Sequence, residues 1–173
     1  MKKYISLFIV CFYSFGFAQV NWLSMNDALK LQKENHKKIL IDFYADWCGP
    51  CKLMEKKTYN HPVISKYIND NFLAVKFDTE SKEIINYLGQ SFDKGNKSRR
   101  PIHQFAEYMN VSSVPSVVFL DENAMPITIL NGLLTAPELE PYLNLIFTNA
   151  YKRIKTKDEW DNFQRKFRSR LKE

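Results

Sequence analysis

Apolar residues in this chain fall into two patterns, short runs and stripes at helical spacing. Four mostly apolar runs have the length of β-strands and lie at residues 39–45, 72–78, 116–120 and 127–130. The first run is apolar apart from Asp42, which is typical of a strand buried on both faces. Stripes and cap residues predict helices over 28–36, 48–59, 63–68, 81–88, 104–110 and 136–147.

One helix boundary carries a specific signal. His61 precedes Pro62, and the residue before a proline is pushed away from helical geometry. The helix that starts near residue 48 is therefore expected to break at His61. We interpret His61 itself as a surface side chain at a helix junction rather than as a general base.

The first 18 residues have the pattern of a secretory signal peptide. Lys2 and Lys3 precede an uncharged run that ends in Gly16-Phe17-Ala18, with small residues at the two positions that a signal peptidase needs. This run is shorter than the roughly 20 residues of a membrane span. The sequence predicts cleavage before Gln19 and an exported protein, periplasmic or secreted. An uncleaved anchor is the less favoured alternative.

Removal of this leader changes both the charge and the cysteine count. The net charge of +6 falls to +4 without Lys2 and Lys3. A modest positive charge with no accompanying motif is typical of a solvated surface, so we expect no nucleic-acid partner. Cys11 lies in the leader, which leaves Cys48 and Cys51 in the mature chain. The 173 residues, 45% of them apolar, suit one domain with a core of its own.

The candidate chemistry lies in WCGPCK, residues 47–52, directly after the first strand. Cys48 falls at a helix start, where unpaired backbone N–H groups and the positive end of the helix dipole favour its thiolate. Pro50 lacks an N–H and fixes φ in the first turn, where that loss is harmless. Cys51 lies one turn further in, close enough to form a disulfide. Such a pair can attack a substrate disulfide and then resolve the mixed disulfide.

Two other interpretations of the cysteine pair are weaker. A zinc site needs about four ligands, whereas the mature chain has no second cysteine pair and only three scattered histidines. A structural disulfide across two intervening residues would constrain almost nothing. We therefore expect a redox pair, with neither a metal nor another cofactor.

The segment DFYADWCGPCK, residues 42–52, resembles the active-site segment of the thioredoxin family. More narrowly, residues 44–62 resemble the C-terminal thioredoxin-like domain of the periplasmic interchange protein DsbD. The resemblance covers residues 36–148. It implies an α/β, thioredoxin-like fold over residues 19–150, with a central mixed β-sheet flanked by helices and an additional helix at the C-terminus.

The same resemblance assigns a substrate surface. Val114-Pro115 resembles the family's cis-proline loop, which faces the CxxC motif and pairs with substrate as an added strand. An ordinary trans proline at a strand entry is the alternative. The residues expected to contact substrate are Trp47, Gly49, Pro50, Val114, Pro115 and Gly132.

Asp42 and Lys76 are expected to serve the second cysteine. A lone carboxylate in so apolar a strand is costly to ionise, so the pKa of Asp42 should be raised. In the family such an aspartate exchanges protons with the buried cysteine, which makes Asp42 the expected general acid/base for Cys51. Lys76 stands where the family often places a lysine facing this aspartate. The alternative is a lysine that points to solvent from an edge position.

Two segments depart from a compact thioredoxin. Residues 90–103 form an inserted loop, basic at Lys94, Lys97, Arg99 and Arg100. A solvated insertion is favoured over a docking site. Residues 151–173 predict an amphipathic extension with a helix over 156–172, whose apolar stripe is Trp160, Phe163, Phe167 and Leu171. Such a helix could contact a membrane or a partner, but the stripe is more typical of packing on the domain.

The resemblance implies a thiol–disulfide oxidoreductase outside the cytosol that reduces protein disulfides and is recharged by a membrane thiol electron donor of the DsbD type. Gly49-Pro50 is the dipeptide of reducing thioredoxins. Oxidising and isomerising relatives usually carry a histidine beside the second cysteine. A disulfide isomerase or oxidase, and a non-catalytic binding module such as a chaperone or metal carrier, remain alternatives.

Overall fold

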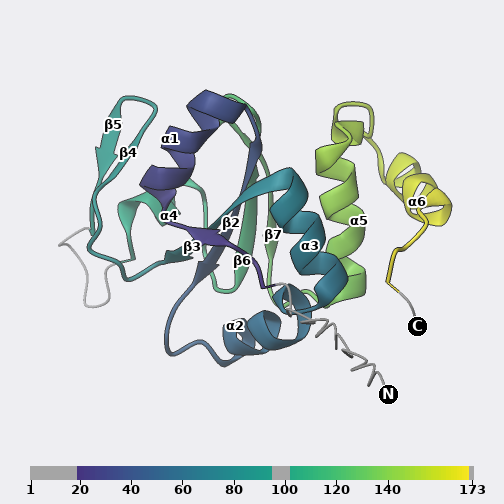
Figure 1. Ribbon diagram of the computed structural model, residues 1–173, viewed down its shortest axis with the longest axis horizontal. Helices are drawn as coiled ribbons and strands as arrows, with labels where there is room; N and C mark the ends of the chain where they lie inside the picture. The colour runs from purple at the N-terminus through teal and green to yellow at the C-terminus, as the bar shows by residue number, and fades with distance from the viewer. Residues whose placement is uncertain (1–18, 95–101, 172–173) are drawn as a thin grey trace, which may run out of the picture.

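A five-stranded mixed sheet organises the structure, a computed structural model that describes residues 19–94 and 102–171 (Figure 1). Its strands lie in the order β1 (Trp22–Leu23), β3 (Phe72–Asp78), β2 (Lys38–Tyr44), β6 (Ser116–Leu120) and β7 (Pro126–Asn131). The first three run parallel, β6 is antiparallel to β2, and β7 is antiparallel to β6. The expected α/β fold with a central mixed sheet is confirmed. The predicted leader, Lys97, Arg99 and Arg100 lie outside the described residues.

Alternation along β2 divides its side chains between two cores. Ile39, Ile41 and Phe43 pack in a cluster with α1 (Met25–Asn35) and α4 (Gln104–Tyr108). Leu40 packs on the other face with α3 (Pro62–Asn71) and α5 (Ala136–Phe147). Because successive side chains of a strand point to opposite faces, Asp42 lies on the face of Leu40, under these helices.

The chain passes from β2 directly into the helical segment that carries the cysteines. Cys48 is the N-cap of α2 (Gly49–Met54), which continues as a π-helical turn, η1 (Glu55–Tyr59). The backbone of His61 is extended, and its Nδ1 accepts the N–H of Val63 at the start of α3. The predicted helix over 48–59 and the break at His61 are confirmed, and the imidazole serves as a helix cap.

Residues 81–92 differ from the prediction of a helix over 81–88. The chain instead forms a hairpin of β4 (Ile85–Tyr87) and β5 (Gln90–Phe92). Ile85 and Tyr87 are buried while Asn86 is exposed, which is the period of a strand. Leu88 and Gly89 both have positive φ, 48° and 78°, as a two-residue hairpin turn requires. The prediction of a loop from residue 90 is therefore wrong at its start, since 90–92 are a strand.

The C-terminal helix is shorter than predicted. After a short 3₁₀ turn, η2 (Ala150–Lys152), α6 spans Lys157–Lys166, and the backbone of Phe167 is extended. Trp160 stacks on Tyr142 of α5 with ring centroids 4.8 Å apart, so α6 lies on the outer side of α5, away from the sheet (Figure 1). Leu171 follows the helix and contacts the core under α3 and α5. Within the described residues, no helix has the length and apolar character needed to cross a membrane.

Candidate active site

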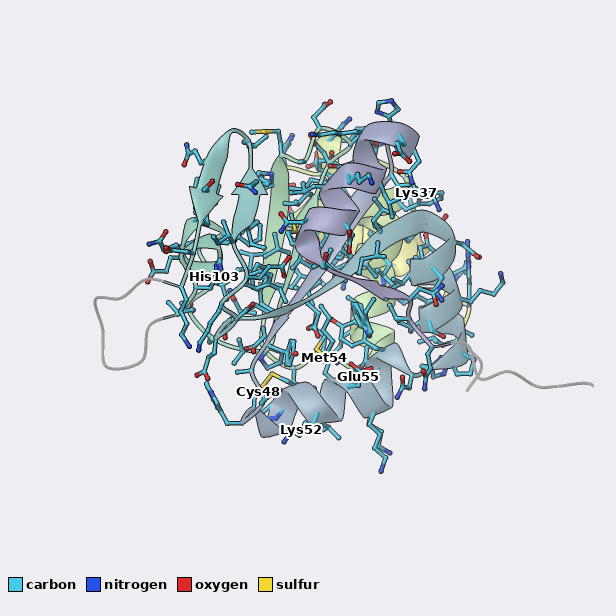
Figure 2. All side chains as sticks on the ribbon, turned by 60° about the vertical axis from the view of Figure 1, so that its left-hand side comes forward. Lys37, Cys48, Lys52, Met54, Glu55 and His103 are labelled. Carbon is cyan, nitrogen blue, oxygen red and sulfur yellow. A yellow bond between two sulfur atoms is a disulfide. The ribbon has the colours of Figure 1, made fainter. Side chains whose placement is uncertain are left out.

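Cys48 and Cys51 form a disulfide at the N-terminal end of α2 (Figure 2). Their Cα atoms are 5.3 Å apart, and the Cys48 Sγ accepts the backbone N–H of Cys51 at 3.1 Å. A backbone N–H group at this helix end therefore faces the first sulfur, where negative charge develops when the disulfide is reduced. The pair can take up two electrons and two protons to become a dithiol.

Both cysteines are nearly closed off from solvent. Cys48 is 2% exposed and Cys51 is 7% exposed. They pack together with Ala45 and with the partly buried Tyr44 and Val114. The second cysteine is shielded from solvent, as the family's buried cysteine implies, and the structure adds that the first one is buried as well.

The loop that precedes β6 lies against this cysteine cluster. The Val114–Pro115 peptide bond is cis, as the resemblance implies, and Val114 contacts the cysteines. Gly132 donates its N–H to the Pro115 carbonyl at 2.8 Å and has a φ of 91°. A Cβ placed on Gly132 would meet no atom within 4 Å. The structure thus brings Val114 to the disulfide, joins Gly132 to the neighbouring Pro115, and leaves open space beside Gly132.

Trp47, Gly49 and Pro50 flank Cys48 in the chain and are exposed. The Trp47 side chain is 68% exposed, and its indole Nε1 donates to the Glu80 carboxylate at 2.9 Å. A large aromatic surface therefore adjoins Cys48 and is held in one orientation. Contact of these residues with a substrate stays a prediction.

Asp42 is buried beneath the helical segment that carries the cysteines, at 3% exposure. Its Oδ1 accepts a hydrogen bond from the Tyr59 hydroxyl at 3.1 Å. Burial raises the pKa of Asp42 to about 7, partly opposed by the Tyr59 hydrogen bond and the positive charge of Lys76, while the charge of Glu55 raises it further. This carboxyl group can therefore gain or lose a proton near neutral pH, as the apolar strand predicted.

Lys76 is opposite Asp42 in the parallel register of β2 and β3, but its ion-pair partner is Glu55. The ammonium pairs with the Glu55 carboxylate and lies 5.1 Å and 5.6 Å from the ring centroids of Tyr44 and Trp22. Lys76 is thus half-buried rather than free in solvent, and it acts on Asp42 through its charge. A cavity of about 400 Å³ beside Cys51 is lined by Tyr44, Ala45, Asp46, Cys51, Lys52, Glu55 and Lys76.

Three residues of this site were missed by the sequence analysis, namely Tyr59, Glu55 and Trp22. Glu55 follows Cys51 by four positions and Tyr59 follows Glu55 by four, so spacing along the helix places all three on one face. That spacing is the signal that could have found Glu55 and Tyr59. Trp22 packs edge-on against the Tyr59 ring, with centroids 4.9 Å apart, and no local pattern indicates this contact.

Three features of this site are those of a protein that exchanges thiols and disulfides. They are a cysteine pair that forms a disulfide, a cis-proline loop beside it, and a buried carboxyl group whose pKa is raised to about 7. A family model of a thioredoxin-like domain matches residues 25–147. The chain belongs to this thioredoxin-like family.

Individual relatives agree with this assignment. The thiol:disulfide interchange protein DsbD of Photorhabdus laumondii is 26% identical over 134 residues, which cover 76% of this chain and 20% of that protein. The chain therefore spans about a fifth of the length of the DsbD proteins that it matches. Thioredoxin-1 of Drosophila melanogaster is 29% identical over 101 residues, covering 58% of this chain and 73% of that protein.

Among solved structures, a thioredoxin-fold protein from Helicobacter pylori matches with a TM-score of 0.60 at 19% identity, covering 76% of this chain and 81% of that one. This likeness confirms the thioredoxin-like fold. Family membership and the Cys48–Cys51 pair together support thiol–disulfide oxidoreductase activity.

Proposed function

We propose that this protein reduces protein disulfides outside the cytosol. The observation that carries the proposal is the Cys48–Cys51 pair at a helix start, packed against the cis Val114–Pro115 loop. The Gly49-Pro50 dipeptide supports the reducing direction, and the leader pattern of residues 1–18 supports export.

The proposed reaction starts from the dithiol. The Cys48 thiolate attacks one sulfur of a substrate disulfide, and the other substrate sulfur leaves as a thiolate. Cys51 then transfers its proton to Asp42 and attacks the Cys48 Sγ. The new Cys48–Cys51 bond displaces the remaining substrate sulfur. Two electrons have then passed from the dithiol to the substrate, which takes up two protons.

Substrate binding would use the surface around the disulfide. An extended substrate segment can pair with the backbone that the cis Val114–Pro115 bond exposes, in the manner of an added strand. The open space beside Gly132 admits side chains of such a segment. The exposed ring of Trp47, the residue before Cys48, offers an apolar contact.

Continued reduction in an oxidising compartment needs a source of electrons. We propose a membrane thiol donor of the DsbD type, supported by similarity to proteins named for thiol:disulfide interchange. The donor would reduce the Cys48–Cys51 disulfide by the same exchange in reverse.

The direction of the reaction is tested by the reduction potential of the Cys48–Cys51 pair, measured by equilibration with glutathione buffers of known poise. A reductase predicts a value of about −270 mV, like that of thioredoxin. A value of about −180 mV or higher is typical of isomerases and oxidases and would contradict the proposed direction.

Catalysis itself is tested by a pair of serine variants. Cys48→Ser should lose disulfide reduction by at least about a hundredfold, because no nucleophile remains. Cys51→Ser should instead accumulate a mixed disulfide between Cys48 and its substrate, visible by mass spectrometry. If Cys48→Ser retains full activity in the protein's biological assay, the protein is a binding module rather than a redox enzyme.

A further inference from the structure

We propose that Tyr59 is a positioning residue for Asp42, its hydroxyl holding the carboxyl group in one orientation and favouring the ionised form beneath the helical segment that carries the cysteine pair. The effect on turnover rests on the proposed reductase function. The effect on Asp42 itself does not, so the two can be tested apart.

The hydrogen bond between the two side chains lies in the interior. Tyr59 is 1% exposed and Asp42 is 3% exposed, and the hydroxyl is 3.1 Å from Oδ1. Within the described residues, no other side chain donates a hydrogen bond to this carboxyl group. Water cannot readily replace the donor at such burial, so the hydroxyl should be worth more to the ionised carboxylate than the same contact at a surface.

The position of Tyr59 is set by its surroundings rather than by the carboxyl group. Its ring packs edge-on against Trp22 of β1, and β1 is fixed by parallel pairing with β3. Tyr59 is also the last residue of the π-helical turn η1, which carries its side chain into the core beneath α3 and α5. The donor is therefore held in place before any proton moves, which is the requirement for a positioning residue.

Other charged or titratable groups face Asp42 from the neighbouring elements. Glu55 approaches from η1 and Lys76 from β3, and these two pair with each other. Tyr44 follows on β2 itself, and Cys51 is carried by α2. On β6, the register partner of Asp42 is Val117, which carries no charge. Since the charge of Lys76 is largely met by Glu55, the hydroxyl of Tyr59 is the direct stabilising contact of the carboxylate.

This contact matters in the second half of the reaction. In the proposed reaction, the Cys51 Sγ–H proton passes to the Asp42 carboxylate as Cys51 Sγ bonds to Cys48 Sγ. The bond between Cys48 and the substrate sulfur breaks, and that sulfur leaves with the electron pair and takes a proton from water. Asp42 can act as this base only when ionised. Loss of the Tyr59 hydroxyl should therefore shift the reaction to higher pH.

The direct test is the titration of Asp42 in the oxidised protein, where the disulfide-bonded cysteines do not titrate. The ¹³C resonance of the Asp42 carboxyl group is followed against pH in the original protein and in Tyr59→Phe. We expect the midpoint to rise by about one pH unit in Tyr59→Phe. In the control Tyr67→Phe, which changes another buried tyrosine located on α3, the midpoint should stay unchanged. Equal midpoints in Tyr59→Phe and the original protein would overturn the proposal.

A measurement on the unaltered protein guards against a Tyr59→Phe variant that does not fold. The Tyr59 ¹³Cζ resonance should shift with pH at the same midpoint as the Asp42 carboxyl group. A Tyr59 resonance that is insensitive to the Asp42 titration would equally overturn the proposal.

The kinetic consequence is measured separately, as mixed-disulfide resolution against pH. A rise of one unit from a pKa of about 7 lowers the ionised fraction at pH 7 from about one half to about one in eleven. Resolution by Tyr59→Phe should then be roughly fivefold slower at pH 7 and nearly unchanged at pH 9. If the original protein reduces no disulfide at all, the proposed function fails, while the titration still decides the role of Tyr59.

Discussion

Asp42 and Glu140 are both buried carboxyl groups, and they differ in what surrounds them. Asp42 lies in the central strand, 3% exposed, and accepts one side-chain hydrogen bond, from Tyr59. Glu140 lies in α5, 1% exposed, and its carboxylate accepts two hydrogen bonds, from the Ser169 hydroxyl at 2.5 Å and from the backbone N–H of Arg170 at 2.7 Å. Both donors to Glu140 belong to the segment that follows α6.

This difference indicates a chemical role for Asp42 and a structural role for Glu140. With a single donor in an apolar setting, Asp42 holds a proton up to neutral pH and can exchange it with a neighbour. Each Glu140 oxygen has a donor, and the Arg170 guanidinium also lies 4.8 Å from the Tyr67 ring centroid. The Glu140 carboxyl group thus ties the C-terminal segment to α5 and α3.

The largest expected effect is a change in the free energy of unfolding caused by the substitution Asp42→Asn. The pKa of Asp42 is raised from 3.8 to about 7 in the folded protein. Between pH 4 and pH 7 the folded state therefore binds more protons than the unfolded state. The stability of the original protein should therefore fall as pH rises from 4 to 7 and level off above. Asparagine has no such titration and still accepts the Tyr59 hydrogen bond. At pH 8, Asp42→Asn should be more stable by up to about 4 kcal/mol.

Urea unfolding of the oxidised proteins at pH 4 and pH 8 checks this, and the two should converge at pH 4. Identical pH dependence in both would mean that Asp42 is not the buried titrating group. The same variant should slow disulfide exchange at pH 7 by about tenfold or more, because the base for Cys51 is gone.

A smaller effect is expected in Glu140→Ala, which tests the structural side of the comparison. The Ser169 and Arg170 donors lose their acceptor, so unfolding in urea should require about 2 kcal/mol less free energy. Trypsin should also cleave faster within residues 165–170. Disulfide reduction should be unchanged, since Glu140 takes no part in the site. A large loss of activity at full stability would remove the distinction between the two carboxyl groups.

Ser169→Ala should show the smallest effect. It removes one of the two donors and leaves the Arg170 N–H in place, so the expected loss is about 1 kcal/mol in the same urea assay. The double variant with Glu140→Ala should lose no more than Glu140→Ala alone, because both changes remove the same contact. Additive losses would show that Ser169 stabilises the fold in some other way.

Local signals in the sequence were sufficient for the elements around the cysteines. The strand over 72–78 and the helix break at Pro62 follow from apolar patterning and from the steric demands of proline. The hairpin of β4 and β5 could not be recognised in this way. Its strands are three residues each, too short for a period of two to be told from a helix. It is held by packing against residues distant in the sequence, and the ring centroids of Tyr87 and Phe105 are 5.3 Å apart.

The predicted length of the C-terminal helix was wrong for a related reason. The stripe from Trp160 to Leu171 fits a single helix, but α6 ends at Lys166. Beyond that point the backbone follows the hydrogen bonds of Ser169 and Arg170 to Glu140, about 30 residues earlier in the chain. A local sequence pattern spans only a few residues, so it cannot include both partners of that contact.

The sequence by itself therefore determined the redox pair, the helix start that presents it and the family to which the chain belongs. These depend on residues a few positions apart, whose backbone geometry is set locally by proline, caps and unpaired N–H groups. Only the tertiary structure decided the partners of the buried groups. Tyr59 for Asp42, Glu55 for Lys76 and the C-terminal segment for Glu140 meet across separate elements. Such side-chain contacts depend on proximity in space, which local patterning does not encode.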